Sequence, residues 1–358
     1  MNPASPIRRA EEVRRAPRAL VAHVITESLP FGGAQRNTLL TVAELLRRGF
    51  RVDLVCGPPG GELERAARAA GAGVEVVPDL LRKTASRSDL RTLWRLARLF
   101  RERRYDVVHT HSTKAGLLGR AAAWIAGVPV IVHTFHGFPF VLDRSLRSRL
   151  FIAVERLVGR ITDASVCVAE ALRAEVAGWG IPRPQKLVTI YSGIDFSACR
   201  ASRSRQDSRR MLGLDGAWPV IGSIGHLRDA KAQEDLIEAA AILREKYPDL
   251  RLLIVGEGER RPLLEARIRA LDAGGQVRLL GERSDVVDLL EVFDVYAMSS
   301  RWEGVGRALT EAMYRGLPVA VTDVYGVREV VVHEETGLAV PPGDPRALSA
   351  AIDRLVSD

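Results

Sequence analysis

Short runs of β-branched and other apolar residues alternate along most of the chain with amphipathic stretches of about 12 to 16 residues. Such alternation is typical of βαβ units and predicts parallel sheets covered by helices. Strands are predicted in a first series at residues 20–26, 52–56, 74–77, 107–111, 130–134, 165–168 and 187–190. A second series is predicted at residues 220–224, 252–255, 277–280, 295–298 and 319–322.

Helical patterns fill the gaps between these strands. In residues 34–48, for example, Leu39, Val42 and Leu46 recur at helical spacing and fall on one face, and Gly49 follows as a stop signal. The two series are separated by a segment rich in Arg, Ser and Asp without a sustained apolar period. We therefore expect an α/β protein with two Rossmann-like domains, whose parallel sheets face a central cleft that binds ligands.

This pattern also gives expected boundaries. Residues 1–18 are predicted to be a disordered basic arm, 19–196 the first Rossmann-like domain, 197–217 a linker and 218–358 the second Rossmann-like domain. The arm contains five arginines and three prolines, but it lacks the apolar core of a signal peptide.

Composition excludes several classes of protein. With 358 residues, 47% of them hydrophobic and 27% charged, the chain is long enough for two cores and unlike a disordered, collagenous or coiled-coil protein. No apolar run approaches the roughly 18 residues of a membrane span, since the longest, 121–132, is interrupted by Gly127 and Pro129. The three cysteines form neither a CxxC motif nor a Cys/His cluster, which favours a reducing, cytoplasmic location.

Charge is distributed unevenly between the two halves. Residues 1–196 contain 30 Lys and Arg against 18 Asp and Glu, a net charge of +12, whereas residues 197–358 carry a net charge of −4. The excess of basic residues either serves solubility alone or indicates a polyanionic partner. Without a zinc-finger or RNP pattern, nucleic acid is disfavoured, and an anionic membrane surface is the better positive hypothesis.

Glycines after the first predicted strand indicate a phosphate site. Gly32 and Gly33 lie where a strand turns into a helix, so a phosphate could approach backbone N–H groups at the helix start. A tight structural turn explains the same pair equally well. Neither this pair nor Gly256 and Gly258 completes the GxGxxG fingerprint, which disfavours a nicotinamide-dependent oxidoreductase.

The strongest local signal is the segment EGVGRALTEAM at residues 303–313, which follows a predicted strand. Glu303 is expected in a glycine-containing turn and Glu311 about two turns into the next helix. Backbone amides at 304–306 would face an anion, and the two carboxylates would accept hydrogen bonds from vicinal hydroxyls, so a diphosphate between two sugars fits. The alternative is an exposed turn carboxylate and a solvated helix carboxylate.

This segment resembles the E-x7-E signature of glycosyltransferase family 4, retaining GT-B enzymes that use nucleotide-sugar donors. Further segments are similar to that family in the same order: GGAQR, YDVVHTHSTKAGLLGR, HTFHG, IYSGID and GLPVAVTDVYGVREVV. The resemblance covers about residues 20–355 and is to members that build bacterial polysaccharides and lipid-linked glycans. It implies that the first domain binds the acceptor and the second the nucleotide-sugar.

The resemblance also implies roles for individual residues. Glu311 matches the glutamate that binds the donor ribose, Glu303 the one that contacts the transferred sugar, and Lys231 in GHLRDAK the basic residue that neutralises the diphosphate. His136 in HTFHG matches the active-site histidine of the first domain. The expected catalytic residues are His136, Glu303 and Lys231, and the expected donor-binding residues are Gly33, Arg228, Lys231, Glu303, Gly304, Val305, Gly306 and Glu311.

One position departs from the family. Where members usually have an arginine before the leucine of GHLRDAK, this chain has His226, and a neutral imidazole supplies less positive charge than a guanidinium. Arg228, two residues further on, or Arg307 at the helix start is the candidate to compensate.

No metal or other cofactor is expected besides the nucleotide-sugar. His109, His111, His133 and His136 lie within 28 residues, but no acid or thiol is spaced to complete a zinc site. His109 and His133 are interpreted as packed in the sheet or satisfied by hydrogen bonds. The chain has no Asp-x-Asp pair, the metal-binding device of the other glycosyltransferase fold. Cations and helix dipoles are then expected to stabilise the leaving diphosphate.

The acceptor side is less specific. An aromatic loop at 135–141 is followed by a basic helix at 144–160. The apolar residues of this helix are Leu146, Leu150, Phe151, Val154, Leu157 and Val158. Their helical spacing favours core packing, while the basic charge of the domain leaves open that loop and helix rest on anionic lipid.

The favoured function is transfer of a sugar from a UDP-sugar, or less readily a GDP-sugar, to a glycan or a polyprenyl-diphosphate-linked saccharide, with retention of configuration and without metal. The enzyme would be cytoplasmic or peripheral on the inner face of the cell membrane. Two alternatives stay open, a sugar-nucleotide 2-epimerase on the same scaffold and a non-catalytic scaffold.

Overall fold

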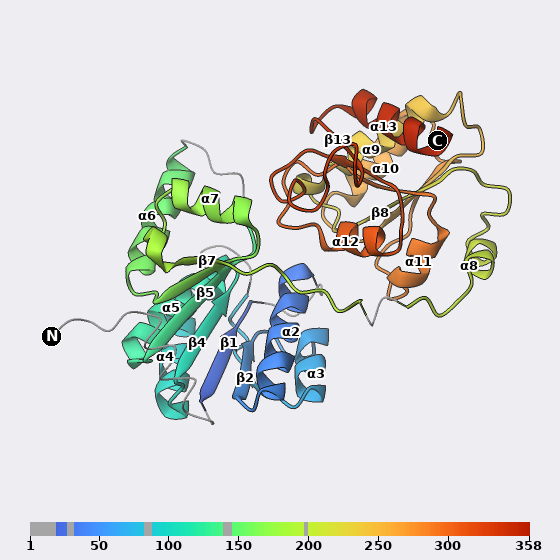
Figure 1. Cartoon of the computed structure of the whole chain (residues 1–358). Helices are drawn as coiled ribbons and strands as arrows, with labels where there is room; N and C mark the ends of the chain where they lie inside the picture. Colours follow the sequence, from blue (N-terminus) through green and yellow to red (C-terminus); the bar gives the residue numbers. More distant parts are fainter. Residues whose placement is uncertain (1–18, 27–31, 82–87, 139–144, 197–199) are drawn as a thin grey trace. The chain divides into compact units, whose positions relative to one another are not determined.

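The computed structural model describes residues 19–26, 32–81, 88–138, 145–196 and 200–358. The chain forms two compact units, Met1–Gly193 and Ile194–Asp358 (Figure 1), and each is described here by itself. The expected basic arm, 1–18, lies outside the described residues. In the described part of the chain, no helix combines the length and hydropathy that a membrane span requires.

The first unit contains a seven-stranded parallel sheet in the order β3-β2-β1-β4-β5-β6-β7. Its strands are β1 (Leu20–Val24), β2 (Arg51–Cys56), β3 (Gly73–Val76), β4 (Val107–His111), β5 (Val130–Phe135), β6 (Ala164–Cys167) and β7 (Leu187–Thr189). The strand order reverses between β1 and β4, and ligands of open α/β sheets bind beyond the carboxyl ends of strands at such a point.

Helices cover both faces of this sheet. They are α2 (Gly33–Arg47), α3 (Glu62–Ala69), α4 (Asp89–Arg103), α5 (Thr113–Ala126), α6 (Leu146–Arg160), α7 (Glu170–Gly178) and the short 3-10 helix η1 (Pro184–Lys186). One core lies between the sheet and α4 and α5, and a second lies between the opposite face and α2 and α3. Both faces are therefore buried, and β4 and β5 carry buried histidines and threonines toward their carboxyl ends.

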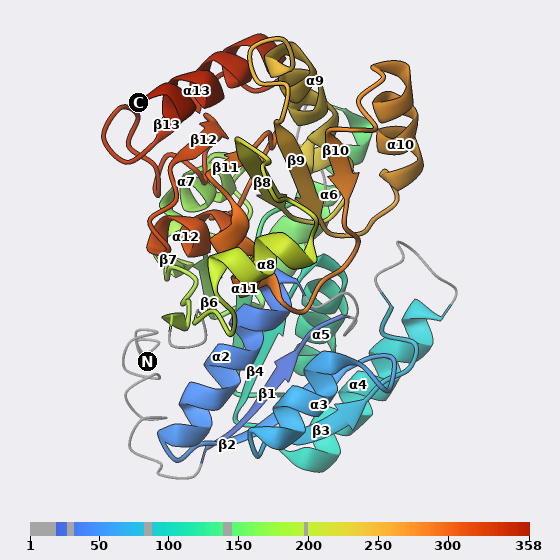
Figure 2. The same ribbon diagram turned by 90° about the vertical axis from the view of Figure 1, so that its right-hand side faces the viewer.

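The second unit repeats this architecture with six parallel strands in the order β10-β9-β8-β11-β12-β13. The strands are β8 (Val220–Ile224), β9 (Arg251–Val255), β10 (Val277–Leu279), β11 (Val295–Met298), β12 (Val319–Thr322) and β13 (Leu338–Val340). Figure 2 shows β8, β9 and β10 next to one another, with α9 and α10 beside them. Here the order reverses between β8 and β11.

The helices of this unit also form two layers. They are α8 (Arg205–Met211), η3 (Asp229–Lys231), α9 (Gln233–Leu243), α10 (Arg261–Ala270), α11 (Val286–Val292), α12 (Arg307–Tyr314) and α13 (Pro345–Ser357). α9, α10 and α13 pack on one face of the sheet, and α11 and α12 pack on the other. Asp344 caps α13 by accepting a hydrogen bond from the N–H of Ala347, with Pro345 in the first turn.

The α/β architecture predicted from the sequence is confirmed, and every predicted strand overlaps an observed one. The prediction missed β13, a three-residue edge strand that pairs with β12. The structure also differs from the expected linker at 197–217, because that range contains α8, which packs against α11. Arg205 of α8 donates hydrogen bonds to the carbonyls of Glu291 and Phe293, which fixes the helix to the second unit. The expected cleft between the sheets stays a prediction.

Candidate active site

The carboxyl ends of β8 and β11 bring Lys231 and Glu303 together. β8 leads into a loop and η3, which carries Lys231, and β11 leads into the turn that carries Glu303. The Nζ atom of Lys231 forms an ion pair with Oε2 of Glu303, and the two side chains are only 14% and 12% exposed. Ser300 donates a 3.3 Å hydrogen bond to the same carboxylate oxygen. Two of the expected catalytic residues are therefore in direct contact.

Glu311 is the fifth residue of α12, eight residues after Glu303. Its carboxylate accepts a 3.0 Å hydrogen bond from Nε of Arg307, one turn earlier. The pKa of the buried Tyr296 of β11 is raised, mainly by burial of its phenol. The negative charges of Glu303 and Glu311 raise it further. Both carboxylates therefore lie near enough to Tyr296 of β11 to affect its phenol, and a shared binding role of the E-x7-E pair stays a prediction.

The turn between the two glutamates presents backbone at the start of α12. Gly306 caps the helix with a φ of 69°, in the left-handed region that favours glycine. Gly326, in the segment after β12, packs so closely on this turn that a Cβ there would meet the carbonyl oxygen of Gly304 at 1.6 Å. The N–H groups that begin α12 consequently form a fixed positive end suited to an anion.

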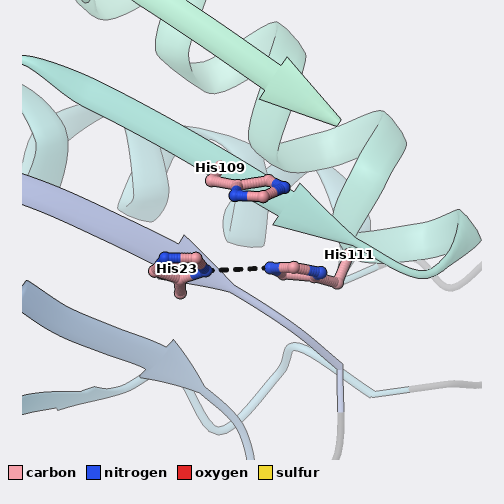
Figure 3. A group of neighbouring side chains, drawn as sticks. All are labelled: His23, His109 and His111. Atoms are coloured by element: carbon pink, nitrogen blue, oxygen red, sulfur yellow. Dashed lines mark hydrogen bonds between the residues drawn. The ribbon is translucent and has the colours of Figure 1, made fainter. Parts of the chain in front are cut away.

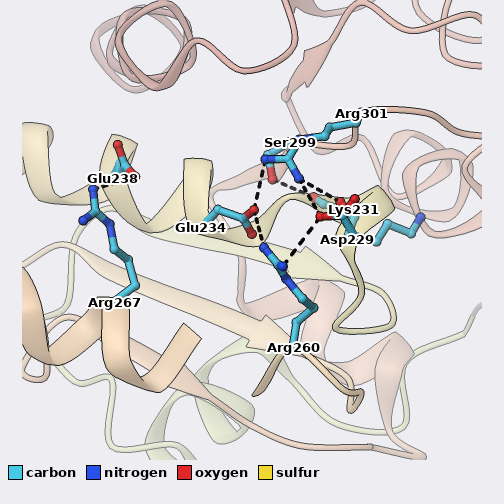
Figure 4. A network of polar contacts seen from close by, with 8 residues as sticks. All are labelled: Asp229, Lys231, Glu234, Glu238, Arg260, Arg267, Ser299 and Arg301. Atoms are coloured by element: carbon cyan, nitrogen blue, oxygen red, sulfur yellow. Dashed lines mark hydrogen bonds and ion pairs between the residues drawn. The ribbon is translucent and has the colours of Figure 1, made fainter. Parts of the chain in front are cut away.

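A network of ion pairs fixes the loop that carries Lys231 (Figure 4). Arg301 pairs with Asp229 at 3.0 Å and with Glu234 at 3.1 Å, and Arg260 pairs with the same Glu234 at 2.8 Å. The Ser299 hydroxyl donates a 3.0 Å hydrogen bond to the carbonyl of Lys231. These contacts tie the loop after β8 to the loop after β11, so the network positions Lys231 against Glu303. Sequence analysis missed it, since its members lie up to 72 residues apart.

The residues that were candidates to replace the missing arginine lie in different settings. The guanidinium of Arg228 lies 5.4 Å from the centre of the Trp302 ring, beside the Glu303 turn. Arg307 is engaged with Glu311. His226 places Nδ1 at 3.3 Å from the carbonyl of Glu257, and its own carbonyl accepts from Gln233. Arg228 is the better placed of the two arginines to add charge next to the Lys231 loop.

In the first unit, Gly33 is the first residue of α2, directly after the cap Gly32. No atom of the described residues lies within 4 Å of the position that a Cβ on Gly33 would take. Its φ is not in the left-handed region either. The local structure therefore does not require glycine at 33, which disfavours the explanation as a tight turn.

His136 follows β5 and is joined to two other histidines. Its Nε2 lies 3.2 Å from Nδ1 of His111. Nε2 of His111 in turn lies 2.9 Å from Nδ1 of His23, the contact drawn in Figure 3. Burial lowers the pKa of both His136 and His23 to about 4, so both rings are neutral at neutral pH. Sequence analysis did not include His23.

The histidines of the strands lie on two faces of the sheet. β1 and β4 pair His23 with His109 and place His111 on the same face. His133 lies on the other face, where Thr110 contacts its Nδ1 at 2.9 Å. Thr134 contacts Nε2 of His109 at 2.7 Å. The interpretation of His109 and His133 as hydrogen-bonded residues of the sheet agrees with these contacts.

Among the described residues, His23, His109 and His111 are the group whose nitrogens, all within 4.8 Å of one another, could hold a metal ion. The rings of His109 and His111 are stacked, with centroids 4.4 Å apart and planes inclined by 30°. A metal bound by both would have to lie in both ring planes, which stacked rings do not permit at the roughly 2.1 Å of a metal–nitrogen bond. We assign these contacts to hydrogen bonding and packing.

The prediction of core packing for the helix after the aromatic loop is only partly right. In α6, Ile152 and Val158 are buried, and Phe151 packs edge-on against Phe138. The exposed apolar side chains are Leu146, Leu150, Val154 and Leu157. Residues 139–144, which include the rest of the expected aromatic loop, lie outside the described residues.

Comparison with known proteins extends these observations to the whole chain. Residues 31–198 match the family model described as Glycosyltransferase Family 4, and residues 204–358 match that described as Glycosyl transferases group 1. The UDP-Gal:alpha-D-GlcNAc-diphosphoundecaprenol alpha-1,3-galactosyltransferase of Escherichia coli is 31% identical over 346 residues, which span 94% of this chain and 88% of that protein. The chain belongs to the GT-B glycosyltransferases. It is accordingly an enzyme.

Other relatives of this glycosyltransferase point the same way. A D-inositol 3-phosphate glycosyltransferase of Jonesia denitrificans is 30% identical over 272 residues, 71% of this chain and 64% of that protein. Among solved structures, Anabaena HepE in complex with UDP and glucose has a TM-score of 0.81 at 24% identity, covering 94% of this chain and 90% of that one. The lipopolysaccharide enzyme WaaG has a TM-score of 0.74 at 18% identity, with coverage of 94% and 90%. These structures share the GT-B fold.

Proposed function

We propose that this glycosyltransferase transfers a sugar from a UDP-sugar to a polyprenyl-diphosphate-linked saccharide, with retention of configuration and without a metal ion. The observation that carries the proposal is the ion pair between Lys231 and Glu303 at the start of α12. It combines a cation for the diphosphate with a carboxylate for sugar hydroxyls. We propose retention of the anomeric configuration because the E-x7-E segment resembles that of a retaining family.

The donor half of the proposal rests on three groups within the second unit. Lys231 neutralises the diphosphate, the N–H groups at 304–306 bind a phosphate oxygen, and Glu303 and Glu311 accept hydrogen bonds from the sugar and the ribose. A bound diphosphate competes with Glu303 for Lys231, which frees the carboxylate for the transferred sugar. Anabaena HepE, which shares the fold, has been solved with UDP-glucose, and this supports uracil as the base.

The proposed reaction is a front-face displacement. The bond between the anomeric carbon and the diphosphate oxygen breaks while the acceptor oxygen forms its bond on the same face of the sugar. The proton of the acceptor hydroxyl passes to the departing phosphate oxygen. Lys231 and the start of α12 stabilise the negative charge that develops on UDP, and His136 binds the reacting sugar.

The acceptor half rests on the first unit. The Escherichia coli relative acts, by its name, on a diphosphoundecaprenol-linked sugar. Leu146, Leu150, Val154 and Leu157 recur along one side of α6 and are exposed, and the exposed Arg149 and Arg160 flank them. An amphipathic basic helix of this kind binds the surface of an anionic membrane, where a lipid-linked acceptor resides. We therefore place the enzyme peripherally on the inner face of the cell membrane.

The direct test incubates the purified full chain with each UDP-sugar and GDP-sugar and a short-chain polyprenyl-diphosphate-GlcNAc, with EDTA present. We expect an elongated lipid-linked product with one UDP-sugar and the same anomeric configuration as the donor, read by NMR. A product of inverted configuration, or transfer only after a divalent metal is restored, would contradict the proposal. Epimerised nucleotide-sugar formed without acceptor would instead favour the 2-epimerase.

A pair of lysine variants links the activity to the site. Lys231→Ala removes the cation beside the diphosphate and should lower kcat/KM about 100-fold or more. Lys246→Ala is the matched control, because Lys246 forms an exposed ion pair with Asp353 at 2.6 Å near the end of α9, away from the Glu303 turn. Equal activity of both variants would show that Lys231 does not carry the proposed role.

A further inference from the structure

The strongest unexplained feature of the molecule is the imidazole chain, by which we mean His23, His111 and His136. Both contacts within it are hydrogen bonds between ring nitrogens, at 2.9 Å and 3.2 Å. The middle ring uses both of its nitrogens, Nε2 toward His23 and Nδ1 toward His136. His109 packs against His23 and His111, with ring centroids 4.8 Å and 4.4 Å away.

Neutrality of the three rings makes their tautomers interdependent. Burial lowers the pKa of all three, and for His111 the charges of the neighbouring histidines lower it further. A neutral imidazole has one N–H and one lone pair. Each hydrogen bond of the imidazole chain needs one N–H and one lone pair. All three N–H groups must therefore point in the same direction along the imidazole chain. Only two arrangements satisfy both bonds.

The buried end of the chain distinguishes these two arrangements. Nε2 of His23 is fully buried and, among the described residues, has no hydrogen-bond partner. If the N–H groups pointed toward His23, that nitrogen would be a buried donor without an acceptor, a situation that proteins avoid more strictly than an unused acceptor. The favoured arrangement therefore runs from His23 through His111 to His136.

We propose that His23 and His111 are positioning residues that hold His136 as the Nδ1–H tautomer. His23 donates from Nδ1 to His111, and His111 donates from Nδ1 to Nε2 of His136. The remaining N–H of His136, on Nδ1, then donates to a substrate oxygen. This inference rests on the proposed function in one respect, the identification of His136 as a residue that touches the reacting sugar. It makes His136 a neutral hydrogen-bond donor and not a general base.

The tautomer is measured without any substrate. Full-length protein labelled with 15N-histidine, studied by NMR at pH 7.5, should show a proton on Nδ1 and a lone pair on Nε2 for each of the three rings. The loss of signals in His23→Asn, His111→Asn and His136→Asn variants assigns the resonances. A proton on Nε2 of His136 would overturn the inference. So would a shift of the three signals on addition of Zn2+, which would indicate a metal site instead.

Amide side chains test the role of the chain in activity. The amide nitrogen of Asn takes the place of Nδ1 of a histidine and that of Gln the place of Nε2, so His111→Asn keeps the donor to His136 and His111→Gln removes it. We expect His111→Gln to lower kcat about 10- to 100-fold with little change in the KM of the donor. His111→Asn should restore kcat to within about threefold of the wild type. His23→Asn and His23→Gln should differ in the same sense, by a smaller factor.

His133→Asn is the control for loss of a buried histidine, because His133 lies on the opposite face of the sheet and is not part of the imidazole chain. Its kcat per folded protein, with folding checked by circular dichroism, should match the wild type. Equal kcat values for His111→Asn and His111→Gln would overturn the positioning role even if the NMR tautomer is as expected. If the full-length protein transfers no sugar at all, the proposed function fails. The NMR experiment still decides which tautomers the imidazole chain adopts.

Discussion

Gly33 and Gly326 are glycines for opposite reasons. A Cβ on Gly326 would overlap the carbonyl of Gly304, whereas a Cβ on Gly33 would meet no described atom within 4 Å. Among the described residues, packing therefore requires glycine at position 326 and not at position 33. At Gly33 the remaining physical reason is close approach of a ligand to the backbone at the start of α2.

The substitution Gly33→Ala tests this reasoning. Alanine fits the helix and is about 1 kcal/mol more favourable than glycine in a helix interior, so we expect the melting temperature to stay constant or rise slightly. Donor affinity should fall, measured as Kd for UDP and for the UDP-sugar by calorimetry. Gly326→Ala is the contrasting variant, expected to lower the melting temperature. An unchanged Kd in Gly33→Ala would show that no ligand approaches this residue.

Arg228, the candidate to compensate for His226, gives a second prediction at this scale. Arg228 lies beside Trp302 and adjoins the loop of Lys231. If it supplies the charge that His226 lacks, Arg228→Ala should raise the donor KM about tenfold. Steady-state kinetics at varied donor concentration measure the effect. An unchanged KM would leave Arg307 as the compensating residue.

At the scale of elements, strand register explains what the sequence did and did not reveal. Glu303, Gly306 and Glu311 lie within one turn and one helix, so a local motif and its family resemblance were enough to single them out. His23 and His111 are 88 residues apart and meet only because β1 pairs with β4 in one specific register. A slip of one residue would move His109 and His111 to the other face. Sequence patterns do not specify such a register between non-consecutive strands.

The ion-pair network around Lys231 also joins residues that are far apart in the sequence, such as Arg301 and Asp229. Arg301→Ala removes contacts to Asp229 and Glu234 that hold the Lys231 loop. We expect the donor Kd to rise about three- to tenfold, because the lysine must then be ordered on binding. Arg267→Ala is the control, since Arg267 pairs with Glu238 at 2.7 Å on α9 and contacts neither loop (Figure 4). Equal Kd values for the two variants would contradict a positioning role of the network.

The exposed face of α6 gives a prediction about membranes. The full chain should bind vesicles of phosphatidylglycerol and phosphatidylcholine in a co-sedimentation assay, and more weakly as salt rises. Leu150→Glu should weaken binding about tenfold or more, because burial of a leucine contributes about 1.5–3 kcal/mol. Met211→Glu is the control, an exposed apolar residue on α8 of the acidic unit. Absence of binding at low ionic strength would refute the membrane surface.

On the scale of the whole molecule, the sequence predicted the two α/β units because buried parallel strands are nearly continuous apolar runs. The sequence did not predict elements whose apolar pattern is too short or too polar. β13 contains only Leu338–Val340, and α8 is a seven-residue helix with the sequence RQDSRRM. Both are held by neighbours, β13 by the ladder with β12 and α8 by hydrogen bonds to the end of α11. Tertiary contacts of this kind leave little trace in local periodicity.

The two units should also respond differently to acid. Five of the seven histidines lie in the first unit, and burial lowers the pKa of all five, in His23 and His136 from 6.5 to about 4. Such a histidine binds its proton more readily in the unfolded chain. Its contribution to stability is complete above pH 6.5 and is lost as the pH falls toward 4. For His23 alone the loss approaches about 3 kcal/mol.

In the second unit, several carboxyl groups among the described residues have shifted pKa values. Hydrogen bonds lower the pKa values of Asp285, Asp288 and Asp353, so their contribution is lost only as the pH falls below the ordinary 3.8. Burial raises the pKa of Asp235, so protonation of that carboxyl does not reduce stability as the pH falls. Between pH 6.5 and 4.5 the first unit should therefore lose stability while the second keeps it.

Hydrogen exchange read by mass spectrometry at pH 7.0 and pH 5.0, corrected for the intrinsic rate, measures this difference. Core peptides of β1, β4 and β5 should lose protection at the lower pH, and those of β8, β9 and β11 should not. His23→Asn, which removes one of the titrating groups, should reduce the effect in the first unit. Equal loss of protection in both units would show that the buried histidines do not govern acid stability.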